Sequence, residues 1–127
     1  MKQFMFLCYD DEQHWLNVGP EVHTAAIQQA VAITTRLDRQ GRFVSAAPLQ
    51  PSSTATSVRI RDGKRRITDG PFAETREVLG GYYLIFALDH AEALTFAAEH
   101  PGVHVGAVEV REVFDLVSMA TATLESN

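Results

Sequence analysis

The segment TDGPFAETREVLGGYYLI, residues 68–85, joins the two signals that decide the fold. Its second half opens an apolar run, residues 80–88, that predicts a central β-strand buried on both faces. Its polar first half follows the alternating segment TSVRIRDGKRRITD, in which Asp62-Gly63 favours a two-residue turn. We therefore expect a β-hairpin over residues 56–69, inserted directly before a buried strand.

Strands and helices alternate through the rest of the chain. Residues 2–9 (KQFMFLCY) predict a second central strand and residues 106–113 a last one, while residues 42–51 begin as an edge strand that two prolines break. A helical apolar repeat runs from Pro20 to Gly41. A second helix starts at Asp89, with Glu92 completing a capping box, and stops at residues 100–102. Residues 10–20 are interpreted as a polar connection.

This order of elements predicts an α+β fold of the ferredoxin-like split βαβ type with an inserted β-hairpin. Helices cover one face of such a sheet, yet both central strands are apolar on both faces. A second copy of the chain is the simplest cover for the other face, so we expect a homodimer and a dimeric α+β barrel. Residues 1–115 form one domain in this interpretation, and residues 116–127 form a C-terminal tail of undetermined conformation.

Composition narrows the functional classes. The 127 residues carry a formal net charge of −5, which argues against nucleic acid as the main partner. The single cysteine, Cys8, lies in an apolar run, where burial raises a thiol pKa, so we expect a structural rather than a nucleophilic role. No apolar run is long enough for a signal peptide or a membrane span, which predicts a cytoplasmic protein.

Asp69 is the first candidate for chemistry. An aspartate that opens a turn usually accepts a hydrogen bond from the N–H two residues later, but that residue is Pro71, which has none. Its carboxylate either bonds to the N–H of Phe72 or is held for a ligand, a proton transfer or an arginine. Glu74 follows closely and is the second catalytic candidate, because neighbouring carboxylates raise one another's pKa. A solvated charge cluster with Arg76 and Glu77 is the alternative.

The last strand supplies a further pair. Glu109 and Arg111 share one strand face, so they either line a polar cleft between the two sheets or form an ion pair between subunits. Glu109 is the third catalytic candidate, and Arg111 is a ligand-binding candidate. Tyr9 and Tyr82 add hydroxyls to this cleft or fill the core, and His23 is the one histidine retained as a binding or acid–base candidate. The histidine spacing forms no metal-binding pattern, and we expect no metal or cofactor.

The predicted hairpin is strongly basic. Alternation places Val58, Ile60 and Ile67 on one face, and the opposite face carries Arg59, Arg61, Lys64 and Arg66. Such a face can engage an acidic protein partner or a phosphate. It can equally serve to keep an exposed edge from aggregating.

Five sequence blocks carry a family resemblance: PLQP (48–51), ATSVRIRDGK (55–64), TDGPFAETRE (68–77), LGGYYLI (79–85) and VEVRE (108–112). With these blocks in this order, residues 1–114 resemble the YCII-related proteins of the DGPF subgroup. The resemblance implies a ferredoxin-like dimeric α+β barrel. Relatives occur beside, or fused to, alternative sigma factors, and the wider fold includes lactone isomerases and monooxygenases.

Two functions therefore remain open from the sequence. In the first, the protein binds or transforms a small molecule in a polar cleft between the sheets of the dimer. In the second, it is an accessory interaction module, associated with transcription regulation of the sigma-factor type, that uses its basic hairpin.

Overall fold

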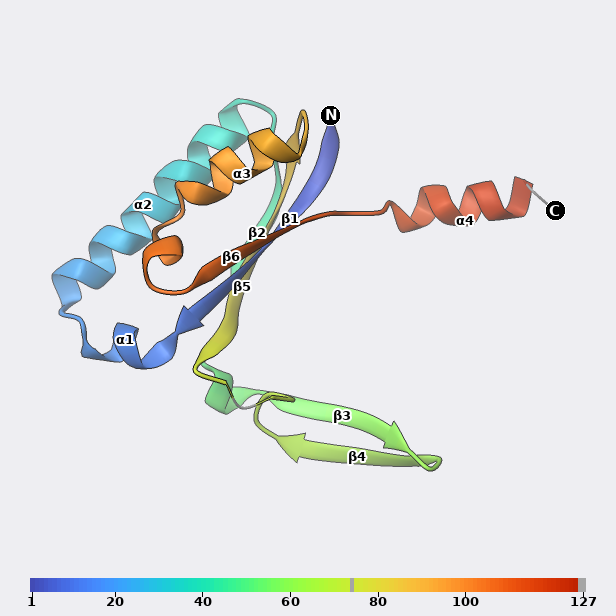
Figure 1. Cartoon of the computed structure of the whole chain (residues 1–127), viewed down its shortest axis with the longest axis horizontal. Helices are drawn as coiled ribbons and strands as arrows, with labels where there is room; N and C mark the ends of the chain where they lie inside the picture. Colours follow the sequence, from blue (N-terminus) through green and yellow to red (C-terminus); the bar gives the residue numbers. More distant parts are fainter. Residues whose placement is uncertain (74, 126–127) are drawn as a thin grey trace.

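The structure, a computed structural model of the chain, describes residues 1–73 and 75–125 (Figure 1). It is an α+β fold, as expected, built on a four-stranded antiparallel sheet in the order β2-β5-β1-β6. The strands of this sheet are β1 (Lys2–Asp11), β2 (Phe43–Pro48), β5 (Glu77–Ala87) and β6 (Ala107–Glu112). The helices are α1 (Glu12–Asn17), α2 (Pro20–Arg39), α3 (His90–Ala98) and α4 (Leu116–Glu125), with 3₁₀ turns η1 (Ser52–Thr54) and η2 (Pro101–His104).

The core lies between one face of this sheet and helices α2 and α3. Its central side chains, Leu37 and Ile85, are completely buried. The ten core side chains come from β1, β5 and the two helices: Phe4, Phe6, Cys8, Ile33, Leu37, Tyr83, Ile85, Ala87, Ala93 and Ala97. Because side chains alternate along a strand, the neighbours of these strand residues point to the opposite face of the sheet. There Met5, Leu7, Leu84 and Phe86 are only half-buried.

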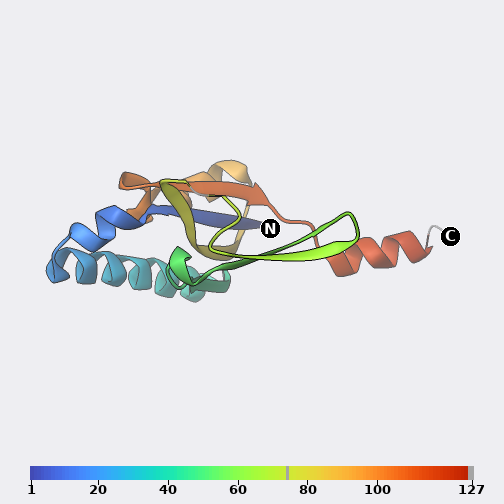
Figure 2. The same cartoon turned by 90° about the horizontal axis from the view of Figure 1, so that it is seen from below.

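A separate two-stranded hairpin, β3 (Thr56–Arg61) and β4 (Lys64–Asp69), extends away from the sheet (Figures 1 and 2). Its register confirms the prediction, since Arg61 pairs with Lys64 and the pairing continues to Thr56 and Asp69. The turn residues have positive φ angles, 52° at Asp62 and 72° at Gly63, as expected for this tight hairpin turn. All side chains of β4 are exposed.

One segment differs from the sequence interpretation, and the structure adds the conformation of a second. The polar connection contains the short helix α1, which apolar periodicity could not reveal and which begins because Asp11 accepts hydrogen bonds from the N–H groups of Gln13 and His14. The C-terminal tail contains α4, which points away from the sheet (Figure 1). None of the described helices combines the length and apolarity that crossing a membrane requires.

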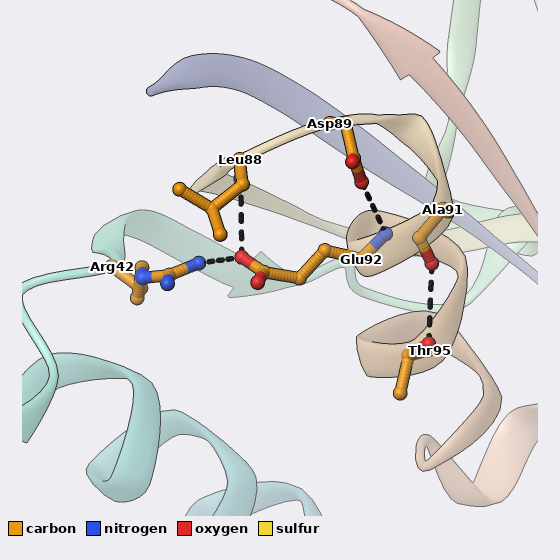
Figure 3. A network of polar contacts seen from close by, with 6 residues as sticks. All are labelled: Arg42, Leu88, Asp89, Ala91, Glu92 and Thr95. Atoms are coloured by element: carbon orange, nitrogen blue, oxygen red, sulfur yellow. Dashed lines mark hydrogen bonds and ion pairs between the residues drawn. The ribbon is translucent and has the colours of Figure 1, made fainter.

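A polar network joins the start of β2 to helix α3 (Figure 3). Asp89 caps the helix as predicted, because its carboxylate accepts a hydrogen bond of 2.9 Å from the N–H of Glu92. The Glu92 carboxylate accepts a hydrogen bond from the N–H of Leu88, which lies one residue before the N-cap residue that bonds in an ordinary capping box. The same carboxylate forms an ion pair with Arg42. Arg42 also lies over the ring of Phe96, so this network fastens the start of β2 to helix α3.

Candidate functional site

The site begins at an irregularity between β1 and β5. Cys8 pairs with Gly81 and Tyr9 with Leu79, so Gly80 is an extra residue, a β-bulge. The carbonyl of Gly80 accepts a hydrogen bond of 2.8 Å from the N–H of Leu49. A Cβ atom added at Gly80 would overlap the carboxylate of Asp10. Because the φ angle of Gly80 is not positive, glycine is needed here for space rather than for its backbone conformation.

Asp10 points from β1 to the same side of the sheet as the helices. Burial raises the pKa of its carboxyl group above the ordinary value, and the nearby Glu12 adds to this rise. A hydrogen bond from the Trp15 indole and the charge of His100 oppose the rise. The result is a half-buried carboxyl group whose proton affinity exceeds that of an exposed aspartate, which is useful in a group that accepts a proton from a substrate.

His100 lies beside Asp10, at the start of η2. Its Nδ1 accepts a hydrogen bond of 3.0 Å from the N–H of Gly102. Burial lowers the pKa of the imidazole, while the Asp10 charge opposes this. The bond at Nδ1 also places the proton of the neutral ring on Nε2, which makes Nε2 a hydrogen-bond donor. A Cβ added at Gly102 would lie 2.9 Å from His100 Nδ1 and 3.5 Å from Asp10 Oδ1, so the two groups approach one point.

Three further polar side chains complete the inner part of the site. The Tyr83 ring packs edge-on against His100, with ring centroids 5.4 Å apart. Burial raises the pKa of the Tyr83 hydroxyl, which shares a hydrogen bond with Thr34. Burial also raises the pKa of the Cys8 thiol to about 12, so this cysteine carries no thiolate at neutral pH, in agreement with the structural role expected for it.

Two cavities meet at Asp10 and His100. The inner cavity, about 410 Å³, lies between α2 and strands β1, β2 and β5. The outer cavity, about 740 Å³, lies between α1, α2, the loop after β2 and η2. The residues that line both are Asp10, Ala30, Pro48, Gly80 and His100. These volumes fall in the usual range for small-molecule sites.

The structure does not bring the predicted catalytic carboxylates together. Asp69 lies exposed at the end of β4, outside both cavities, and no hydrogen bond or ion pair of its carboxylate is found among the described residues. Glu74 lies outside the described residues. Glu109 forms an ion pair with Arg111 of the same strand, at 2.8 Å, on the sheet face that the helices do not cover.

The predicted ligand-binding residues are likewise dispersed. Tyr9 is half-buried and, like Arg111, lies on the uncovered face of the sheet. The hydroxyl of Tyr82 donates a hydrogen bond of 3.3 Å to Ser45, and Tyr82 lines the inner cavity. His23 is exposed, lines the outer cavity and packs edge-on against Trp15.

Asp10 and His100 were missed as candidates because no local pattern links two residues 90 positions apart. Two signals were available in the sequence. Asp10 directly follows a strand that is apolar on both faces, where a carboxylate is unusual. Gly80 lies inside a predicted strand, where a glycine often marks the close approach of another group, and in the structure the Asp10 side chain lies against both Gly80 and Gly102.

The fold and site together define a small α+β protein with an aspartate and a histidine at the junction of two cavities. A profile of the YCII-related domain matches residues 2–117, and the chain belongs to this family. It is also 33% identical over 110 residues to an uncharacterized protein of Rhizobium meliloti (strain 1021), over 85% of this chain and 89% of that relative.

Proposed function

We propose that the protein binds a small carbonyl compound where the two cavities meet and catalyses proton transfer at the carbon next to the carbonyl. The observation that carries this proposal is the pairing of a carboxyl group of raised pKa, Asp10, with an imidazole of lowered pKa, His100. Groups with pKa values shifted in this way divide the work of base and hydrogen-bond donor.

In this reaction Asp10 is the general base. Its carboxylate takes the proton from the carbon, and the electrons of the C–H bond form the enolate. The neutral His100 ring donates a hydrogen bond from Nε2 to the carbonyl oxygen, where negative charge develops. In a hydroxymethyl ketone, the hydroxyl proton then passes to the former carbonyl oxygen, and return of the proton from Asp10 to the former carbonyl carbon completes an isomerisation to a hydroxy aldehyde. If the Asp10 proton first exchanges with solvent and returns to the original carbon, the result is an exchange with solvent.

Proton exchange in D₂O tests this proposal directly. A hydroxymethyl ketone such as 1-hydroxy-4-phenylbutan-2-one is incubated with the protein, and loss of the C–H signal next to the carbonyl is followed by NMR. We expect catalysed exchange that falls by at least about 10²-fold in Asp10→Asn and His100→Gln. The exposed Asp89→Asn cap variant lies away from the cavities and serves as a control. Exchange at the wild-type rate in both site variants would exclude the assigned roles.

For the assembly, we propose a ferredoxin-like dimeric α+β barrel, with the chain in the DGPF subgroup of its family. The strand order β2-β5-β1-β6 supports the ferredoxin-like arrangement, since the two halves of a split βαβ interleave in this way. Half-buried apolar side chains on the uncovered sheet face support the dimer, since that face needs a cover. The molar mass in solution, measured by light scattering, tests it.

A second function, in which the hairpin binds a protein partner such as an alternative sigma factor, has one supporting observation. Val58, Ile60 and Ile67 are 56–60% exposed on a hairpin whose other face carries Arg59, Arg61, Lys64 and Arg66. An isolated two-stranded hairpin of this kind is marginally stable without a partner surface. Titration of a purified alternative sigma factor against the wild type and the Arg59→Glu/Arg66→Glu variant tests it, with at least tenfold weaker binding by the variant expected.

A further inference from the structure

The two cavities that meet at Asp10 and His100 have different linings. The inner cavity is walled mainly by apolar side chains, among them Ile27, Val31, Phe43 and Ala46. The outer cavity adds hydrogen-bonding side chains from three segments: Gln13, His23, Gln50 and Ser53. A ligand that spans the junction therefore meets an apolar wall on one side and hydrogen-bonding groups on the other.

The charges around this junction are all acidic. Asp10 and Glu12 line the outer cavity, and no lysine or arginine lines either cavity in the part of the chain that the structure describes. Three arginines near these elements are paired with carboxylates: Arg36 with Glu99, Arg42 with Glu92 and Arg76 with Asp11. A carboxylate or phosphate group in this site would face like charge without a cation to balance it.

We propose that the substrate is an uncharged carbonyl compound with two unlike ends. An aromatic ring or branched chain occupies the inner cavity, the carbonyl lies between Asp10 and His100, and a hydroxyl or amide end occupies the outer cavity. This inference rests on the proposed function and adds the class of substrate to it. It excludes keto acids and phosphorylated compounds, whose negative charge binding sites ordinarily balance with arginine or lysine.

Three ligands that differ only at one end test the proposal. 4-Phenylbutan-2-one, 1-hydroxy-4-phenylbutan-2-one and 2-oxo-4-phenylbutanoate share the phenyl ring and the ketone, and end in a methyl, a hydroxymethyl and a carboxylate group. Each is titrated into the full chain, and the dissociation constant is taken from the NMR shifts of the Gly102 amide and the His100 ring. We expect the hydroxymethyl ketone to bind at least tenfold more tightly than the oxo acid, with the methyl ketone between them.

A pair of variants on helix α2 locates the phenyl ring. Val31 lines the inner cavity and is 58% exposed, whereas Val22 is 54% exposed and lines neither cavity. Val31→Asp places a charge against the ring and is expected to weaken binding of both neutral ketones by at least tenfold. Val22→Asp adds the same charge to the same helix at similar exposure and is expected to leave the dissociation constants unchanged.

The proposed substrate class would be overturned if the oxo acid bound as tightly as the hydroxymethyl ketone. It would also be overturned if neither neutral ketone bound at concentrations up to its solubility limit. Equal effects of Val31→Asp and Val22→Asp would overturn the placement of the ring. Failure of the proposed reaction has a separate signature. In that case the neutral ketones bind in the expected order, but the protein does not accelerate their exchange in D₂O.

Discussion

Adjacent glycines in β5 predict opposite effects of the same substitution. A Cβ at Gly81 would lie 2.9 Å from the carbonyl oxygen of Ala47 and 3.2 Å from the Cα of Pro48, both backbone atoms of the neighbouring strand. Gly81→Ala therefore has to push β2 and β5 apart, which costs about 1–3 kcal/mol by analogy with overpacked cores. For a chain of this length, that corresponds to a fall in Tm of roughly 4–12 °C.

A Cβ at Gly80 meets the carboxylate of Asp10, which is the free end of a short side chain and can rotate away. Replacing a glycine of permitted φ by alanine also stabilises by about 0.4–1 kcal/mol through the unfolded chain. We therefore expect Gly80→Ala to change the free energy of unfolding by less than about 1 kcal/mol. The carboxylate moves by about 1 Å, a displacement that reduces catalysis by about 10²-fold.

Thermal unfolding and the exchange assay distinguish the two variants. Because Trp15 is the only tryptophan and bonds to Asp10, its indole N–H resonance reports movement of the carboxylate without any substrate. Gly80→Ala is expected to shift this resonance and to slow exchange with little change in Tm. Gly81→Ala is expected to lower Tm and to leave the indole resonance unshifted. An equal loss of Tm in both variants, or an unshifted indole resonance in Gly80→Ala, would refute the reasoning.

Three further predictions concern pH, stability and assembly. Catalysed exchange requires ionised Asp10 and neutral His100, so the rate should rise as the pH increases through the raised pKa of Asp10 and should not fall at higher pH through loss of the His100 proton. A rate that declines as His100 loses its proton would contradict the assignment. Because burial raises the folded-state pKa of Asp10, its ionised form destabilises the fold, and Asp10→Asn should raise Tm at pH 7. This gain should shrink as the pH falls through the raised pKa and vanish below the ordinary aspartate pKa, which thermal melts across pH would show. Leu84→Glu, on the uncovered sheet face, should yield a monomer by light scattering, whereas Leu94→Glu on α3, where the leucine is 47% exposed, should leave a dimer. If both variants were monomers, or both were dimers, the result would count against this face as the interface.

Local sequence signals predicted the local structure well. The hairpin register followed from Asp62-Gly63, because a two-residue turn leaves one pairing for the flanking strands. The limits of α2 followed from Pro20 at its start and Gly41 beyond its end, where φ is +70°. These features depend on backbone geometry within a few residues, which single residues dictate.

The candidate site depended on contacts that the sequence does not encode locally. Asp69 was a candidate because Pro71 removes its usual backbone partner, but the geometry of one turn does not determine which elements lie nearby. Asp10 and His100 meet only because the fold brings strand β1 into contact with the turn η2. The raised pKa of Asp10 comes from burial, which tertiary packing decides.

The bulge at Gly80 divides strand β1 into two parts with separate tasks. In β1, the residues up to Cys8 pair with β5 in one register, and Phe4, Phe6 and Cys8 face the core. From Tyr9 onward the register is shifted by one residue, and Asp10 faces the cavities. A register break of this kind lets the second part change without moving the first. For protein engineering, residues 9–11 and 77–80 can therefore be randomised as one block to seek new chemistry, with the core half of both strands kept as a fixed scaffold.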